Sequence, residues 1–357
     1  MIIGYLLRRR DADCLPVGEI SPVTWRILRI DVVAGAGAHN GRVRDQILDP
    51  EPTTAGLSRT VRSSRPFDVG LTVVPLRRGG GDPCHHVDAT GAHWHASRMP
   101  TGVVTFRLAQ DGRDGARASA WGPGAAEFID GLERMLCLDE DLADFAPEHP
   151  KLVEAHRVVP GLRMLRTGLV FESLVPAILE QKVHTKSSFA AWRSLVREFG
   201  TAAPGPAPAG LMVAPDARTW QHIPSWKYHR ANVGPQRAQT IVRAARVADS
   251  IERTATLPPE EAARRLRSLP GIGVWTVAET AQRAFGDADA LSVGDYHLAA
   301  TVGWSLLGHP IDDDAMVEYL EPLRPHRYRA VRLLALSGQA IKPKFGPRTP
   351  ITDHRHR

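Results

Sequence analysis

The spacing of apolar and polar positions divides the chain into a β-rich part and a longer helical part. Between residues 67 and 121, the runs "FDVGLTVVPL", "HWHAS" and "GVVTFRLA" are short and are separated by Gly- and Asp-rich turns. Such runs predict the strands of an antiparallel sheet. From about residue 124 the apolar residues recur every three or four positions, as they do in helices. We therefore predict an α+β protein in which a small antiparallel β domain precedes an all-helical body.

The composition of the chain sets the limits of these parts. Residues 1–65 have little periodicity and many Gly, Pro and Arg residues, so we predict a weakly ordered extension there. The β domain is expected at 66–123, the helical body at 124–340 and a basic tail at 341–357. Within the body, the run "TAAPGPAPAG" at 201–210 has the composition of a linker.

The helical body contains several segments whose apolar residues share one face, which is typical of helices that pack on a core. These segments are expected at 171–200, with a break near residue 184, and at 236–250, 259–269, 274–285, 296–307 and 326–336.

Charge and cysteine content narrow the choice of partners. The 357 residues carry a formal net charge of +6, and the positive excess lies near the two ends of the chain. A nucleic acid would therefore be bound through local geometry and not through a broad basic field, although such an excess is equally typical of solubility alone. No run approaches the ~18 apolar residues of a membrane span. Cys14, Cys84 and Cys137 are too scattered for a disulfide framework, and Cys84-His85-His86 lacks a fourth ligand at regular spacing. We expect a cytoplasmic protein with no membrane partner and no metal held by side chains.

The stretch "LPGIGVWT" (269–276) joins two predicted helices by a tight turn. Gly271 and Gly273 allow positive φ and leave the neighbouring backbone N–H groups uncovered. Such groups at a helix N-terminus attract anions. We predict that the amides of Gly271, Ile272, Gly273 and Val274 bind a DNA phosphate, while the Ile272 side chain packs between the helices. An ordinary αα-hairpin is the alternative interpretation.

A longer stretch, "LPGIGVWTVAETAQRAFGDADALSVGDYHL", resembles the helix-hairpin-helix DNA glycosylase superfamily. That motif has a hairpin, then a Gly/Pro-rich loop, here 286–294, and then an aspartate, here Asp295. The segments "FESLVPAILEQKV" and "VGPQRAQTIVRAA" are similar to two further helices of the superfamily, with the hairpin helices at 259–285. A β-rich part ahead of the helices is typical of its alkylpurine branch, that of DNA-3-methyladenine glycosylase II.

The resemblance implies base excision repair, in which an alkylated purine is flipped out of duplex DNA and its N-glycosidic bond is hydrolysed. Asp295 would be the catalytic carboxylate, because it can stabilise an oxocarbenium-like sugar and activate water. The leaving base is already cationic and needs no general acid. The alternative role for Asp295 is the N-cap of the helix predicted from Tyr296, and both roles can hold together.

Trp275 stands where the lyase branch of the superfamily has a nucleophilic lysine. The resemblance therefore implies a monofunctional enzyme that leaves the abasic site uncut. It implies no cofactor, because the chain has no cysteine cluster after Cys137 for an iron–sulfur centre. A monovalent cation at the carbonyls of the hairpin is implied by the resemblance alone.

The base pocket implied by the resemblance contains aromatic side chains that stack on the flipped base. Trp275 and Tyr296 match its aromatic positions, with core packing as the alternative for each. Glu279 and Ala335 stand where the superfamily's typical member has aromatic residues, which makes the pocket larger or more polar. A polar pocket at Glu279 would suit a neutral base held by hydrogen bonds.

The remaining DNA contacts follow from the same resemblance. Gln181 and Lys182 match the intercalating turn, with Lys182 in the place of an apolar wedge, and Arg237 matches a phosphate contact. Plain surface positions are the alternatives for all three. We expect a monomer whose partner is duplex DNA containing damaged bases. The other functions left open are a non-catalytic lesion-binding protein and a glycosylase for an oxidised or deaminated base.

Overall fold

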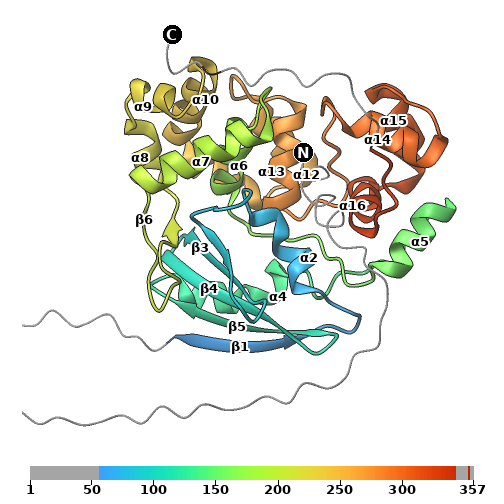
Figure 1. Cartoon of the computed structure of the whole chain (residues 1–357), viewed down its shortest axis with the longest axis horizontal. Helices are drawn as coiled ribbons and strands as arrows, with labels where there is room; N and C mark the ends of the chain where they lie inside the picture. Colours follow the sequence, from blue (N-terminus) through green and yellow to red (C-terminus); the bar gives the residue numbers. More distant parts are fainter. Residues whose placement is uncertain (1–55, 343–352, 354–357) are drawn as a thin grey trace, which may run out of the picture. The chain divides into compact units, whose positions relative to one another are not determined.

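The computed structural model describes residues 56–342 and residue 353, which combine a five-stranded antiparallel sheet with many helices (Figure 1). The strand order is β1-β5-β4-β3-β2. The strands are β1 (Leu57–Arg62), β2 (His85–Val87), β3 (His93–Met99), β4 (Gly102–Asp111) and β5 (Gly115–Trp121). The prediction of a mixed fold that combines an antiparallel sheet with many helices is confirmed.

One face of the sheet is covered by a short helix, α3 (Ala125–Asp130). Phe106 of β4 lies opposite Ala120 of β5, and the small alanine leaves room for the helix. Phe128 stacks on Phe106 with ring centroids 4.3 Å apart. This packing fixes the sheet against the start of the helical part.

Two predictions about the β-rich part are wrong. The run "FDVGLTVVPL" forms helix α2 (Val69–Val73) and the 3₁₀ helix η2 (Val74–Leu76), not a strand. The carboxylate of Asp68 accepts a hydrogen bond from Leu71 N at 2.8 Å, which starts the helix. Strand β1 lies inside the stretch predicted as a weakly ordered extension and pairs with β5 along its whole length. The rest of that extension, 1–55, and most of the basic tail lie outside the described residues.

The helices follow the predicted pattern closely. They are α4 (Leu132–Met135), α5 (Pro150–Val158), α6 (Val170–Leu179), α7 (Thr185–Phe199), α8 (Ala217–His222), α9 (Ser225–Arg230), α10 (Pro235–Arg246), α11 (Ala248–Glu252), η3 (Arg253–Thr256), α12 (Pro259–Arg267), α13 (Val274–Ala284), α14 (Leu298–Val302), the π-helical turn η4 (Gly303–Leu307), α15 (Asp313–Leu320), η5 (Glu321–Leu323) and α16 (Arg327–Ser337). In the described part of the chain, none of the helices has the length and apolarity needed to cross a bilayer.

The helices pack together around two clusters of buried apolar residues. The first joins α6, α7, α10 and α13, with Leu174 and Ile178 of α6 at its centre. The second joins α5, α14, α15 and α16. Helix α13 packs along α6, so the predicted hairpin is anchored on a helix that has almost no exposed surface.

The predicted linker at 201–210 is packed against the sheet. It forms a small hairpin from β6 (Thr201–Ala202) and β7 (Met212–Val213). A Cβ atom on Gly205, whose φ is +73°, would lie 2.4 Å from the Trp121 side chain. Glycine there permits close packing, so this Pro/Ala/Gly-rich segment between α7 and α8 is an ordered hairpin packed on Trp121.

Buried histidines sit on the edge of the sheet beside α2. His95 is 4% exposed and lies opposite His85 in the β2–β3 register. Burial, followed by the charge of Arg78, lowers the pKa of His95 to about 3. His95 is therefore neutral in the folded protein at pH 7.

We expect acid to destabilise the wild type more than a His95→Gln variant. The folded pKa of His95 lies below the unfolded value of 6.5, so the unfolded chain binds the proton first. The penalty begins near pH 6.5 and grows as the pH falls toward 3. Between pH 7 and 5 the wild type should lose about 2 kcal/mol more than the variant. Urea unfolding of both proteins at each pH measures this difference.

The comparison with the variant removes the effects of other groups. Burial raises the pKa of Glu172 to about 7, which stabilises the fold on acidification and opposes the histidine effect. Glu172 is present in both proteins, so its contribution cancels. Parallel loss of stability in the two proteins would show that His95 does not control this pH dependence.

Candidate active site

Helices α12 and α13 form the predicted hairpin, and within the turn between them the Ile272 side chain is directed into the core. Ile272 is only 6% exposed and belongs to the cluster around α6 and α10. The prediction that Ile272 packs between the helices is therefore confirmed.

The two glycines of the turn have different reasons to be glycine. Gly271 has a φ of +95°, and a Cβ atom there would lie 2.3 Å from Thr240 Oγ1. Gly273 has φ −98° and ψ 179°, an extended backbone that any residue adopts, so the prediction of positive φ there is wrong. A Cβ atom on Gly273 would meet no atom within 4 Å. The outer side of the turn at Gly273 is therefore open.

Gly273 is also the N-cap of α13 and, having no side chain, provides no capping group. The first amides of a helix have no intrahelical acceptor and carry the positive end of its dipole. Gly273 and Val274 are exposed. The geometry suits an anion, and the phosphate contact of 271–274 stays a prediction.

Gln181 and Lys182 follow α6 and have separate environments. Gln181 Nε2 donates to Gly271 O and to Thr276 Oγ1, both at 2.9 Å, and so ties the end of α6 to the hairpin. Lys182 is exposed and has a φ of +51°, an unusual value for a residue with a side chain. Lys182 is thus presented at the tip of the turn, while the amide of Gln181 faces inward. Their DNA contacts stay predictions.

Arg237 is partly buried and bonds to two backbone carbonyls, and its phosphate contact stays a prediction. Its Nη1 donates to Leu179 O at 2.7 Å and its Nη2 to Asn232 O at 3.1 Å. Burial lowers its pKa. Arg237 therefore links the end of α6 to the loop between α9 and α10, a structural role that the helical pattern alone did not reveal.

Asp295 lies beside the hairpin, as predicted. Its Oδ2 accepts a long hydrogen bond from Trp275 Nε1 at 3.4 Å, and its Oδ1 accepts from His297 N at 2.9 Å. The second bond begins the turn into α14, so the predicted helix at 296–307 starts at Leu298. Asp295 is partly exposed. The carboxylate thus starts a helix and is held next to the hairpin at the same time.

The residues predicted for the base pocket are divided between the surface and the interior. Trp275 is partly buried against Asp295, whereas Tyr296 is 77% exposed with its ring edge against His297. Stacking of a base on Tyr296 stays a prediction. Ala335 is buried on α16.

Glu279 faces the interior, where it is 4% exposed. Its Oε1 accepts from Ser292 Oγ at 2.6 Å and its Oε2 accepts from Arg283 Nη1 at 3.0 Å. Both carboxylate oxygens are thus engaged, and the geometry does not support a direct contact of Glu279 with a base. Ser292 was missed because nothing in the loop pattern indicates which of its polar residues turns inward.

The backbone carbonyls of the hairpin are the groups that would bind the implied monovalent cation. Leu269 O accepts from Ile272 N at 3.1 Å, and Gly271 O accepts from Gln181. Each carbonyl retains a second lone pair, so the residues are compatible with a cation and that expectation stays a prediction. Among residues 56–342, no group of three or more His, Cys, Asp or Glu side chains is arranged to hold a metal ion.

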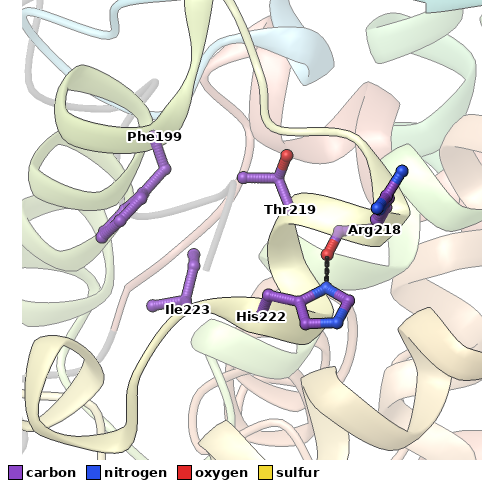
Figure 2. A pocket seen from close by; sticks show the side chains of 5 residues that line it. All are labelled: Phe199, Arg218, Thr219, His222 and Ile223. Carbon is purple, nitrogen blue, oxygen red and sulfur yellow. Dashed lines mark hydrogen bonds between the residues drawn. The ribbon is translucent and has the colours of Figure 1, made fainter.

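A surface pocket of about 320 Å³ lies elsewhere, between α7 and α8 (Figure 2). It is lined by Phe199, Arg218, Thr219, His222 and Ile223. The His222 ring turns back to its own helix, where Nδ1 lies 2.7 Å from Arg218 O. The pocket shares no residue with the hairpin site.

Comparisons with known proteins agree with this geometry. No family model matches the chain. A Mycobacterium tuberculosis protein named as a probable bifunctional transcriptional activator/DNA repair enzyme AlkA is 30% identical over 206 residues, which are 56% of this chain. This chain spans about two fifths of that relative's length, 40%.

Two solved structures share the fold. The 3-methyladenine DNA glycosylase from Archaeoglobus fulgidus has a TM-score of 0.65 at 16% identity, covering 79% of this chain and 98% of that one. The 8-oxoguanine glycosylase/lyase from Clostridium acetobutylicum, in complex with DNA, has a TM-score of 0.60 at 15% identity, covering 80% and 98%.

The hairpin and the aspartate beside it thus occur in a fold that this chain shares with both glycosylase structures, and the chain is similar in sequence to the Mycobacterium tuberculosis relative over 206 residues.

Proposed function

We propose that this protein is a monofunctional DNA glycosylase that removes alkylated purines from duplex DNA as a monomer, in base excision repair. The observation that carries the proposal is the Asp295 carboxylate, held 3.4 Å from Trp275 Nε1 beside the open end of the hairpin. A phosphate bound at the N-terminus of α13 would place the DNA backbone next to this carboxylate.

The chemistry requires a single carboxylate. The bond between C1′ and the base nitrogen breaks, and its electron pair leaves with the cationic base, which becomes neutral. Asp295 stabilises the positive charge that develops on the sugar. Water attacks C1′, and its proton passes to the carboxylate. Trp275 supports a cationic base, because the face of an indole ring attracts positive charge.

Hydrolysis without strand cleavage is supported by Trp275, which has no amine. The charge of one lysine, Lys342, nevertheless acts on a residue beside the site. Burial, followed by the charge of Lys342, lowers the pKa of His297, two residues after Asp295. If the enzyme were also a lyase, Lys342 would be the amine to examine.

A glycosylase for oxidised purines is the second candidate, because the fold is also similar to that of an 8-oxoguanine glycosylase/lyase, with a TM-score of 0.60 against 0.65 for the 3-methyladenine glycosylase. Glu279 no longer favours it, since both carboxylate oxygens are engaged. Base release from methylated duplex DNA and from duplexes containing 8-oxoguanine separates the candidates. Release of 3-methyladenine or 7-methylguanine without nicking supports the proposal. Release of 8-oxoguanine with borohydride-trapped enzyme would replace it, and binding without release would indicate a lesion-binding protein.

We expect Lys182→Ala to weaken DNA binding and to lower its salt dependence. If Lys182 contacts one phosphate, the slope of log affinity against log salt should fall by about 1. Fluorescence anisotropy with an abasic duplex at several salt concentrations measures the slope. Arg117→Ala removes the same charge from an exposed position on β5 and is the control. Equal slopes for the two variants would contradict the contact.

A further inference from the structure

A buried polar cluster joins helix α13 to the loop at 286–294 that precedes Asp295; it is formed by Glu279, Gln282 and Arg283 of α13 and by Ser292 of the loop. Each of these residues is at most 6% exposed. Ser292 Oγ donates to Glu279 Oε1 at 2.6 Å and accepts from Gln282 Nε2 at 2.9 Å. The single hydroxyl of Ser292 is thus held by two side chains of one helix.

The same helix also holds the backbone of the loop. Gln282 Nε2 donates to Ala290 O at 2.8 Å. Ser292 and Asp295 are joined by a tight turn, in which the backbone N–H of Asp295 donates to Ser292 O at 3.0 Å. Any movement of Ser292 would therefore be transmitted to Asp295.

We propose that Glu279, acting through Ser292, is a positioning residue that sets the place of the Asp295 carboxylate. This inference rests on the proposed glycosylase function. Trp275 and Glu279 lie one turn apart on α13, so one rigid helix contacts Asp295 directly through Trp275 and indirectly through Ser292. Helical elements hold reactive groups more firmly than loops do, and second-layer hydrogen bonds orient the groups that react.

The charge of Glu279 is balanced within the cluster. Arg283 Nη1 donates to Glu279 Oε2, and Arg283 Nε donates to Pro75 O at 3.2 Å. A buried carboxylate is stable only when it is paired and hydrogen-bonded. A carboxylate acceptor also forms a stronger hydrogen bond to the Ser292 hydroxyl than a neutral acceptor would. The cluster therefore combines a balanced charge with a firm hold on the loop.

Ser292→Ala tests this role, with Ser188→Ala as the matched control. Ser188 is equally buried, and its hydroxyl donates to Thr185 O at 3.0 Å within α7. We expect Ser292→Ala to lower the single-turnover rate of base release by about 10- to 100-fold, since small displacements of a reacting group have large effects. Affinity for an abasic duplex should remain within about twofold of the wild type, because the hairpin is unchanged. The control should keep the wild-type rate.

Hydrogen exchange provides a second readout that does not depend on activity. The Asp295 amide should exchange faster in Ser292→Ala than in Ser188→Ala, since its acceptor is Ser292 O. Equal rates of base release in the two variants, or a loss of rate matched by a loss of DNA affinity, would overturn the positioning role. A wild type that releases no base from any damaged duplex would instead refute the proposed function.

Discussion

Asp295→Asn is expected to abolish base release while DNA binding and folding remain. The asparagine keeps an oxygen that can accept from His297 N, as Asp295 Oδ1 does at 2.9 Å, so the turn into α14 should persist. The negative charge beside the sugar is lost. Removal of a group that stabilises transition-state charge typically lowers the rate by about 10³-fold. Single-turnover release of 3-methyladenine from methylated duplex DNA measures the loss.

Asp312→Asn is the matched control for this experiment. Asp312 Oδ1 accepts from Ala315 N at 2.9 Å at the start of α15. The same substitution is thus made at the N-cap of another helix. If Asp295 served only to begin its helix, both variants would release bases at the wild-type rate, and that result would contradict its catalytic role. Loss of activity in Asp295→Asn alone, with unchanged affinity for an abasic duplex, would support it.

The elements that were predicted well have signals that depend only on nearby residues. The hairpin is an example, because amphipathic helices and a turn glycine are visible in a short window. The run at 67–76 is the counterexample. Short apolar runs fit a strand or a helix equally well, and the Asp68 cap decides in favour of helix. β1 was missed because its stability comes from pairing with β5, a partner distant in the sequence.

In the candidate site, too, the features that depend on residues distant in the sequence could not be predicted. Asp295 and Trp275 were predicted from their place in a motif, and the structure brings them together. The environments of Gln181, Arg237 and Glu279 depend on which backbone or side-chain group each meets after folding. A motif states which residue stands at a position, whereas the hydrogen-bond partner is set by tertiary packing. The motif therefore could not show which backbone or side-chain groups these three residues bond to in the folded protein.

The second large effect is expected from alanine at the two hairpin glycines, which should separate folding from DNA binding. Gly271→Ala forces a side chain into a left-handed backbone and against Thr240, which is itself buried and bonded to Gln236 O. We expect a loss of about 2–4 kcal/mol in the free energy of unfolding. Gly273→Ala meets open space with an extended backbone, so its stability should change by no more than about 0.5 kcal/mol.

DNA affinity should follow a different order from stability. A methyl group at Gly273 stands on the open side of the turn, where a phosphate would approach the α13 amides, so Gly273→Ala should weaken binding about tenfold or more although the protein stays folded. Urea unfolding and anisotropy with an abasic duplex measure the two quantities in each variant. Wild-type affinity in Gly273→Ala would mean that the backbone of the turn is not the phosphate site. DNA would then have to be held by side chains such as Lys182, because the carboxylate of Asp295 cannot attract a phosphate.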